Sequence, residues 1–286
     1  MKLEKNKVIS VKFEYAGGES GLKHMLIIPV KISDRIETSF IFDTGIGVNL
    51  LSKELCEEVG CKVAGEIRGK RMTGQEIVIP MSEVPSLSIS NFNKRDVPIA
   101  NWDVRSMLPN LDEFNKVEGY LSLTYFRETP FTIDYKKKTF TIENEESLNE
   151  RSLQGISVPL KISDEDGSLT VSVEMKTPVN ETLLLQLDLG TDIMTLDNRF
   201  SKKLKLISDK ADISTSTILD ETGFLRERFF SKVDGIFSLG STKEVNQTQP
   251  TVMFQNIIHD GIVGNDFFKD FVVTYDLSRS RIIISK

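Results

Sequence analysis

The chain has 286 residues and carries 36 lysines and arginines against 42 aspartates and glutamates, so its formal net charge is −6. Its length suffices for about two domains or one large β domain. Its 39% hydrophobic and 27% charged residues are typical of a globular protein rather than a disordered one. The negative balance predicts no nucleic-acid partner. Two cysteines and two histidines exclude a disulfide scaffold and a multi-cysteine zinc site, so we expect neither a metal nor a cofactor.

Apolar runs in this chain are short, as in Met25-Leu26-Ile27-Ile28, whereas a membrane-spanning helix needs about 20 apolar residues. The first ten residues include three lysines and have no apolar stretch of the kind that forms a signal peptide. We therefore expect no membrane span. The compartment stays unknown, because a signal removed beforehand would be compatible with export.

Strand patterns dominate the chain. Residues Val8 to Phe13 alternate between apolar and polar, which predicts a first strand. The clearest helix follows at Ser52 to Gly60, where Ser52 is a suitable N-cap and Gly60 a suitable stop. Further strands are predicted at 139–142 and 169–173, and weaker helices at 111–115 and 198–206. The sequence therefore predicts a mainly β protein.

A domain boundary is predicted near the middle of the chain. From Glu143 to Arg151 the apolar content falls and the charge rises, as in an exposed linker. We therefore expect an N-terminal domain at 1–146 and a C-terminal domain at 147–286.

The two halves share sequence blocks in the same order, which indicates an internal repeat. The offsets between the blocks run from about 142 to 149 residues, and matching blocks in one order are hard to obtain by chance. The pairs are Ile9-Ser10-Val11 with Ile156-Ser157-Val158, Phe40 to Gly45 with Leu185 to Gly190, Thr73-Gly74 with Thr222-Gly223, and Gly119 to Tyr135 with Gly261 to Leu277.

Each half contains an apolar strand that runs into an Asp-x-Gly loop, at Asp43 and at Asp188. A carboxylate at the end of a buried strand is costly unless it is hydrogen-bonded or paired. The glycine two residues later permits a tight turn that brings backbone N–H groups to the carboxylate. A pseudo-twofold axis between the halves would place Asp43 opposite Asp188.

Phe42-Asp43-Thr44-Gly45 resembles the active-site loop of the aspartic proteases of the pepsin and retropepsin type. Gly119 to Ser122 and Asp260 to Gly264 are similar to the family's apolar-apolar-Gly segment, which lies beneath that loop. The resemblance covers nearly the whole chain and implies an all-β, bilobal acid-protease fold with few short helices. It also implies flap hairpins at Thr73-Gly74 and at Thr222-Gly223.

By this resemblance Asp43 and Asp188 are the catalytic pair of an aspartic endopeptidase. The supporting loop residues are Thr44, Gly45, Leu189, Gly190 and Thr191. The two adjacent carboxylates of such a pair share one proton, and a water between them attacks the peptide bond. The partner implied is a peptide or protein substrate between the lobes, and a fused pair of halves has no need to dimerise, so we expect a monomer.

Two positions depart from the family pattern. Leu189 stands where the family has threonine or serine, and it cannot return the hydrogen bond that Thr44 supplies. Ser122 replaces the glycine of the first apolar-apolar-Gly segment. Leu189 keeps open an alternative reading, a non-catalytic peptide-binding protein of the same fold. A glycosidase that uses two carboxylates fits this pair of loops poorly.

Overall fold

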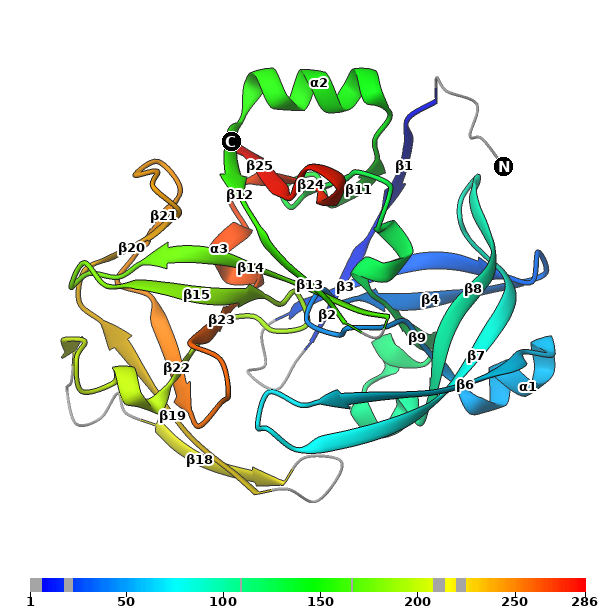
Figure 1. Ribbon diagram of the computed structural model, residues 1–286, viewed down its shortest axis with the longest axis horizontal. Coiled ribbons are helices and arrows are strands. Elements are labelled where there is room, and N and C mark those ends of the chain that lie inside the picture. Colours follow the sequence, from blue (N-terminus) through cyan, green and yellow to red (C-terminus); the bar gives the residue numbers. More distant parts are fainter. Residues whose placement is uncertain (1–6, 18–22, 109, 166, 208–213, 220–224) are drawn as a thin grey trace.

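Three β-sheets organise the protein into two lobes joined by a shared sheet, as the computed structural model shows (Figure 1). The structure describes residues 7–17, 23–108, 110–165, 167–207, 214–219 and 225–286. This is the bilobal all-β fold of the aspartic proteases, as expected. None of the helices in these ranges is both long and apolar enough to cross a membrane.

The sheet of the first lobe has the strand order β2-β3-β4-β9-β5-β8-β7-β6. Along parts of β7 and β8 buried residues alternate with more exposed ones, so one face of these strands packs into the core of the lobe. The strands are β2 (Glu14–Gly17), β3 (Lys23–Ile32), β4 (Ile36–Phe42), β5 (Leu50–Ser52), β6 (Lys62–Lys70), β7 (Glu76–Ile89), β8 (Phe92–Trp102) and β9 (Val117–Leu121).

The sheet of the second lobe has the order β17-β19-β22-β16-β23-β15-β14-β20-β21, and β13 and β18 pair with β14 and β19. Its strands are β13 (Lys161–Glu165), β14 (Ser168–Lys176), β15 (Thr182–Leu187), β16 (Met194–Asp197), β17 (Leu206–Ile207), β18 (Ser214–Leu219), β19 (Leu225–Val233), β20 (Ile236–Leu239), β21 (Asn246–Thr248), β22 (Thr251–Gln255) and β23 (Gly261–Val263).

A six-stranded sheet takes strands from both halves, in the order β1-β11-β10-β24-β25-β12. At its centre β10 pairs with β24, and the hydroxyls of Thr132 and Thr274 lie 2.7 Å apart across this pair. One apolar core cluster runs through both lobes and this sheet. The strands are β1 (Ile9–Lys12), β10 (Phe131–Asp134), β11 (Thr139–Ile142), β12 (Ile156–Pro159), β24 (Val272–Asp276) and β25 (Arg281–Ser285).

Helices are few and short, and the clearest prediction among them is confirmed. In α1 (Lys53–Val59) the Ser52 hydroxyl caps the first turn, and Gly60 ends the helix with φ 69°. The predicted helices at 111–115 and 198–206 form only single 3₁₀ turns, η2 (Asp112–Phe114) and η4 (Asn198–Phe200). The remaining short helices are η1 (Val104–Met107), η3 (Leu123–Phe126), α3 (Asn265–Phe268) and η5 (Leu277–Arg279).

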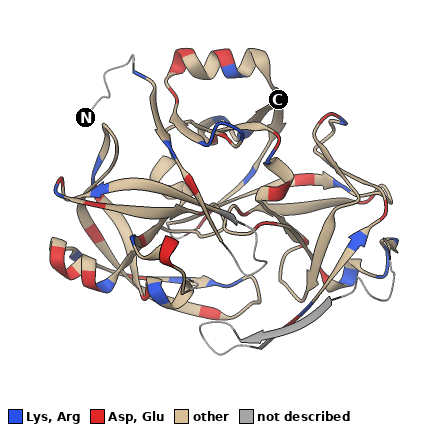
Figure 2. Cartoon of the chain, turned by 180° about the vertical axis from the view of Figure 1, so that it is seen from behind, with Lys and Arg blue, Asp and Glu red and all other residues tan. Residues whose placement is uncertain are grey.

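The segment between the halves is helical, where the sequence suggested an exposed linker. Helix α2 (Glu145–Gln154) begins at Asn144, whose side chain accepts a hydrogen bond from the Ser147 N–H at 2.8 Å. Leu148 is its one buried residue, so the apolar pattern that marks a helix is weak. The helix lies beside the shared six-stranded sheet (Figure 1). Lysines and arginines are spread over both lobes (Figure 2).

Candidate active site

The two Asp-x-Gly loops emerge from equivalent places in the two lobes. Strand β4 pairs in parallel with β9, and β15 pairs in parallel with β23. The N–H of Asp43 then donates to the Leu121 carbonyl at 3.0 Å, and that of Asp188 to the Val263 carbonyl at 3.1 Å. The apolar segments therefore lie beside the loops, as the resemblance implied.

The carboxyl groups of Asp43 and Asp188 each lie against the opposite loop and are close enough to influence each other's pKa. Each also accepts from the N–H of the glycine two residues later, with Gly45 N to Asp43 Oδ1 at 2.8 Å and Gly190 N to Asp188 Oδ1 at 2.9 Å. Both aspartates retain partial access to solvent. They form a carboxyl pair at the junction of the lobes.

Each glycine is also required by the aspartate of the opposite loop. A Cβ at Gly45 would lie 2.2 Å from the Asp188 Cγ, and a Cβ at Gly190 would lie 2.4 Å from an Asp43 carboxyl oxygen. No side chain fits at such distances. The glycines let the loops approach closely enough for the carboxyl groups to meet.

Thr44 connects the loops from one side only. Its hydroxyl donates to the Leu187 carbonyl at 2.8 Å and accepts from the Leu189 N–H at 3.0 Å. Leu189 is fully buried and has no polar side-chain atom, so the reciprocal pair cannot form. The hydrogen bonding between the two loops is therefore asymmetric.

Two asparagines support the loops and were not singled out from the sequence. The side-chain oxygen of Asn49 accepts from the Ser122 N–H at 2.9 Å, and the side-chain NH2 of Asn265 donates to the Leu189 carbonyl at 2.6 Å. Thr191 belongs to this second support, because its carbonyl accepts from the Asn265 N–H at 3.0 Å. Asn265 could have been found from its position in the sequence, because it directly follows the apolar-apolar-Gly segment.

Ser122 is accommodated by hydrogen bonds. Its hydroxyl lies 2.6 Å from that of Thr124 and 3.2 Å from the Asn49 oxygen. At Gly264, the equivalent position, a Cβ would lie 2.7 Å from the Thr191 and Asp192 carbonyl oxygens. The second lobe therefore needs glycine where the first lobe holds serine.

Both carboxyl groups hold their protons more tightly than free aspartic acid. Burial raises the pKa of Asp43, although hydrogen bonds from Gly45, Asp188, Ile46 and Gly190 oppose the rise. Burial also raises the pKa of Asp188, well above the usual value, and the negative charge of Asp43 adds to the effect. More backbone N–H groups act on Asp43 than on Asp188, and such donors favour the ionised form of a carboxyl group.

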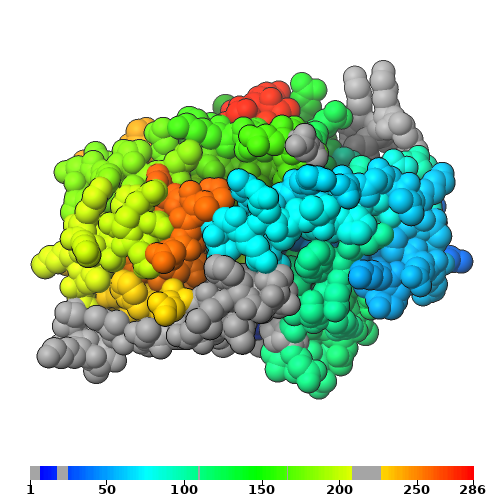
Figure 3. Space-filling view, turned by 60° about the horizontal axis from the view of Figure 1, so that its bottom comes forward, coloured from blue at the N-terminus to red at the C-terminus, as the bar shows by residue number. Residues whose placement is uncertain are grey.

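The predicted first flap is a hairpin of β6 and β7 that reaches the other lobe. In its turn the Gly74 N–H donates to the Arg71 carbonyl at 2.8 Å, and Gly74 has φ 87°. At the tip the Met72 carbonyl accepts from the Ile258 N–H at 2.8 Å, and the hairpin touches the second lobe there (Figure 3). The hydroxyl of Thr73 is buried and makes no hydrogen bond with the described residues.

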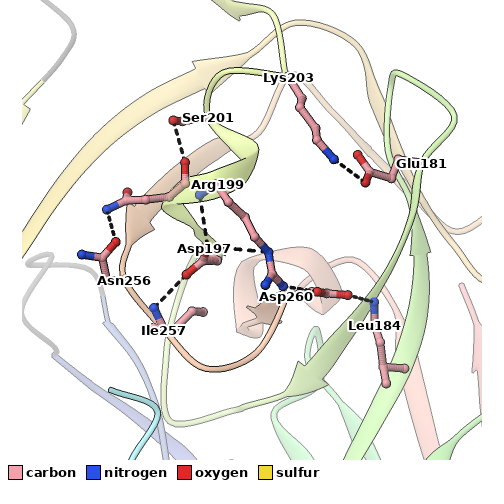
Figure 4. Close-up of polar contacts among 10 residues, drawn as sticks. Glu181, Leu184, Asp197, Arg199, Ser201, Lys203, Asn256, Ile257 and Asp260 are labelled. Carbon is pink, nitrogen blue, oxygen red and sulfur yellow. Dashed lines mark hydrogen bonds and ion pairs between the residues drawn. The ribbon is translucent and has the colours of Figure 1, made fainter. Parts of the chain in front are cut away.

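The loop that receives this hairpin is held by a polar network (Figure 4). The Asp197 carboxylate accepts from the Ile257 N–H and from the Arg199 N–H, both at 3.0 Å. Asp260 is bound by the Arg199 guanidinium and by the Leu184 N–H at 3.0 Å. The flap tip therefore rests on a fixed support.

The predicted second flap is described only in part. Strands β18 and β19 pair as an antiparallel hairpin, from Ser214 opposite Phe230 to Leu219 opposite Leu225. Thr222 and Gly223, predicted at its tip, lie outside the described residues. Among the residues that the structure does describe, no three acidic, histidine or cysteine side chains are placed to hold a metal ion.

Comparisons with known proteins agree with this geometry. Residues 28–121, about a third of the chain, match the family model described as aspartyl protease. No curated protein matches the chain. Among solved structures, basic 7S globulin from soybean and conglutin gamma, a basic 7S globulin from lupine seeds, are similar with TM-scores of 0.54 and 0.55. Each is 10% identical, and each match covers 97% of this chain and 94% of the other. At this identity the two structures establish the fold.

Proposed function

We propose that this protein is an aspartic endopeptidase that hydrolyses peptide bonds with Asp43 and Asp188. The observation that carries the proposal is the close approach of these two carboxyl groups across the loops, each held by the N–H of its own glycine. Two carboxylates in contact cannot both ionise easily, so the pair keeps one proton over a wide pH range. Such a pair provides a general base and a general acid in one place.

In the proposed reaction, Asp43 takes a proton from a water held between the two carboxyl groups, and the water oxygen attacks the carbonyl carbon of the peptide. Asp188 donates its proton to the carbonyl oxygen, which gives a tetrahedral diol. The diol then collapses: the proton held by Asp43 passes to the leaving nitrogen, the C–N bond breaks, and one diol hydroxyl returns its proton to Asp188 as the carbonyl re-forms, which regenerates the pair. The larger number of N–H donors on Asp43 supports its assignment as the base.

The proposed substrate is an extended peptide between the lobes, covered by the β6–β7 hairpin. We further propose that the halves, 1–146 and 147–286, arose by duplication, with each supplying one aspartate. The equivalent pairing of β4 with β9 and of β15 with β23 supports this. One chain then contains a complete pair, and we propose that it acts as a monomer.

A second candidate function is peptide binding without cleavage. The buried Leu189 favours it, because one side of the connection between the loops is missing. Loss of one neutral hydrogen bond is worth about 0.5–1.5 kcal/mol, which is small against the barrier that such enzymes lower. Endopeptidase activity is therefore the first proposal.

Digestion of a peptide library between about pH 3 and 7 tests the proposed activity, since a shared proton requires acidic to neutral conditions. We expect internal cleavage that is greatest at mildly acidic pH and unchanged by EDTA. Stable binding of the same peptides without any cleavage would favour the second candidate. Activity that EDTA removes and zinc restores would contradict the dyad.

A further inference from the structure

A cavity of about 310 Å³ lies in the first lobe, on the side of strand β8 that faces η3. Residues 94–98 of β8 line it in succession, which corresponds to a length of about 13 Å at the rise of an extended strand. One end is formed by Pro98 and Asn49, whose amide donates to the Pro98 carbonyl at 3.1 Å. The Asn49 side chain also accepts from the Ser122 N–H at 2.9 Å, and the preceding Leu121 carbonyl accepts from the Asp43 N–H at 3.0 Å, so this end adjoins the loop of the candidate active site.

Both the flap and the second lobe contribute to the same cavity. Ile67 and Met81 come from strands β6 and β7 of the flap hairpin, and Gly167 comes from the turn between β13 and β14. That turn is fixed on the first lobe, because the Leu169 N–H donates to the Gly47 carbonyl at 2.8 Å. A peptide that lay between the lobes under the flap would therefore pass the opening of the cavity.

The far end of the cavity is basic. Lys94 and Arg127 line it together with Arg95, and two carboxylates, Glu66 and Asp96, also line the cavity. Arg127 is paired with Asp164, Arg95 with Asp34 at 3.6 Å, and Glu66 with Arg68 at 3.2 Å. Asp96 is exposed. These pairs leave two charged side chains of the lining without an ion pair to a described residue, the exposed Asp96 and the half-buried Lys94. Lys94 is therefore the cation of the cavity that is available to a ligand, although Glu128 also acts on it.

Lys94 is half-buried and forms no hydrogen bond or ion pair with any described residue. Its ammonium group lies 5.3 Å from the centre of the Tyr125 ring and 5.8 Å from that of Phe92. The Tyr125 ring is fixed, because its hydroxyl donates to the Leu87 carbonyl at 2.8 Å. Burial lowers the pKa of Lys94. The negative charge of Glu128 raises this pKa, and the positive charge of Arg127 lowers it further. A desolvated cation without a hydrogen-bonded anion is a strong binding site for a carboxylate.

We propose that this cavity binds a carboxylate of the substrate, either an acidic side chain or the C-terminal carboxylate, through Lys94. The inference rests on the proposed peptidase function, and it adds the chemical class of substrate. The length of the cavity, about 13 Å, corresponds to roughly four extended residues, so the carboxylate lies a few residues from the cleaved bond.

The test uses peptides that differ only in their carboxylates. A cleavable peptide is scanned with glutamate against glutamine at each position, and each member is made with a free acid and with an amide at its C-terminus. We expect one glutamate position, or the free acid, to raise kcat/KM at least about tenfold over its neutral counterpart. The glutamate scan shows whether the cavity binds a side-chain carboxylate. The comparison of free acid with amide shows whether it binds the C-terminal carboxylate.

Lys94→Met keeps the length of the side chain and its contact with the rings but removes the charge, so the preference should disappear. Lys94→Arg should keep the preference. Lys202→Met, at an exposed lysine of the second lobe, is the matched control and should behave like the wild type. Thermal melts of all variants identify any that fail to fold. If Lys94→Met is among them, Lys94→Gln takes its place and should likewise lose the preference.

The outcomes separate this inference from the proposed activity. Cleavage without any preference for a carboxylate, or with the same preference in Lys94→Met, would overturn the inference and leave the peptidase proposal standing. If the wild type cleaves nothing, the peptidase proposal fails, and calorimetric titration with the same peptides decides the inference. Binding that requires both a carboxylate on the peptide and Lys94 in the protein would support the inference. Equal binding of acidic and neutral peptides, or no binding of either, would overturn it.

Discussion

At the scale of single residues, the position that sets this protein apart is Leu189. The Thr44 hydroxyl makes two hydrogen bonds to the opposite loop, whereas the side chain of Leu189 is fully buried and makes only apolar contacts. The equivalent acceptor for a hydroxyl at 189 would be the Phe42 carbonyl, since Phe42 precedes Asp43 as Leu187 precedes Asp188. The connection between the loops can therefore be completed by one substitution.

We expect Leu189→Thr to raise kcat/KM up to about fivefold, because a neutral hydrogen bond contributes about 1 kcal/mol. The free energy of unfolding of the Leu189→Thr variant should be about 1–3 kcal/mol lower than that of the wild type, because a buried leucine is replaced by a smaller side chain. Leu189→Val is the matched control, since valine has the shape of threonine without the hydroxyl. Equal rates for the threonine and valine variants would show that the missing hydroxyl does not limit the dyad.

The raised pKa of Asp188 also predicts how stability depends on pH. A carboxyl whose folded pKa is raised stabilises the protein below the unfolded pKa, and this contribution is lost as the pH rises through the folded pKa. Asp188→Asn stays neutral, so its free energy of unfolding should exceed that of the wild type at pH 7. The difference should shrink towards pH 4, as measured by urea unfolding. A difference that does not change with pH would contradict the raised pKa.

At the scale of elements, the β6–β7 hairpin links the two lobes at its tip. The Met72 carbonyl accepts from Ile258, in a loop that Asp197 and Asp260 hold in place. Gly74 forms the turn with a φ of 87°, a backbone angle that residues other than glycine rarely adopt. A Cβ at this position would also lie 3.1 Å from the Ile258 side chain. The conformation of this turn therefore decides whether the tip meets its support.

We expect Gly74→Ala to raise KM about threefold or more, because the strained turn, at a cost of about 1–2 kcal/mol, displaces the tip from Ile258. Gly69→Ala in the same hairpin is the control, since its Cβ would have only Ile77 in reach, at 4.0 Å. Steady-state kinetics on one peptide compare the two. A gain in kcat/KM for Gly74→Ala would show instead that the contact hinders substrate entry.

At the scale of the whole molecule, the proposed internal repeat accounts for how much of the site could be predicted from the sequence. The paired blocks marked the strands that end at the two aspartates, and the structure brings these strand ends together. Helix α2 was missed because Leu148 is its one buried residue. Asn49, Asn265 and the cavity beside Lys94 were missed because they depend on side chains from distant segments, which no local pattern encodes.

The proposal that one chain supplies both aspartates is tested most directly by Asp43→Asn and Asp188→Asn, assayed separately on one peptide. The two carboxyl groups act as a unit, so each variant should lose more than about 10³-fold in kcat while its melting curve shows an intact fold. Substantial turnover by either variant would mean that other residues perform the reaction.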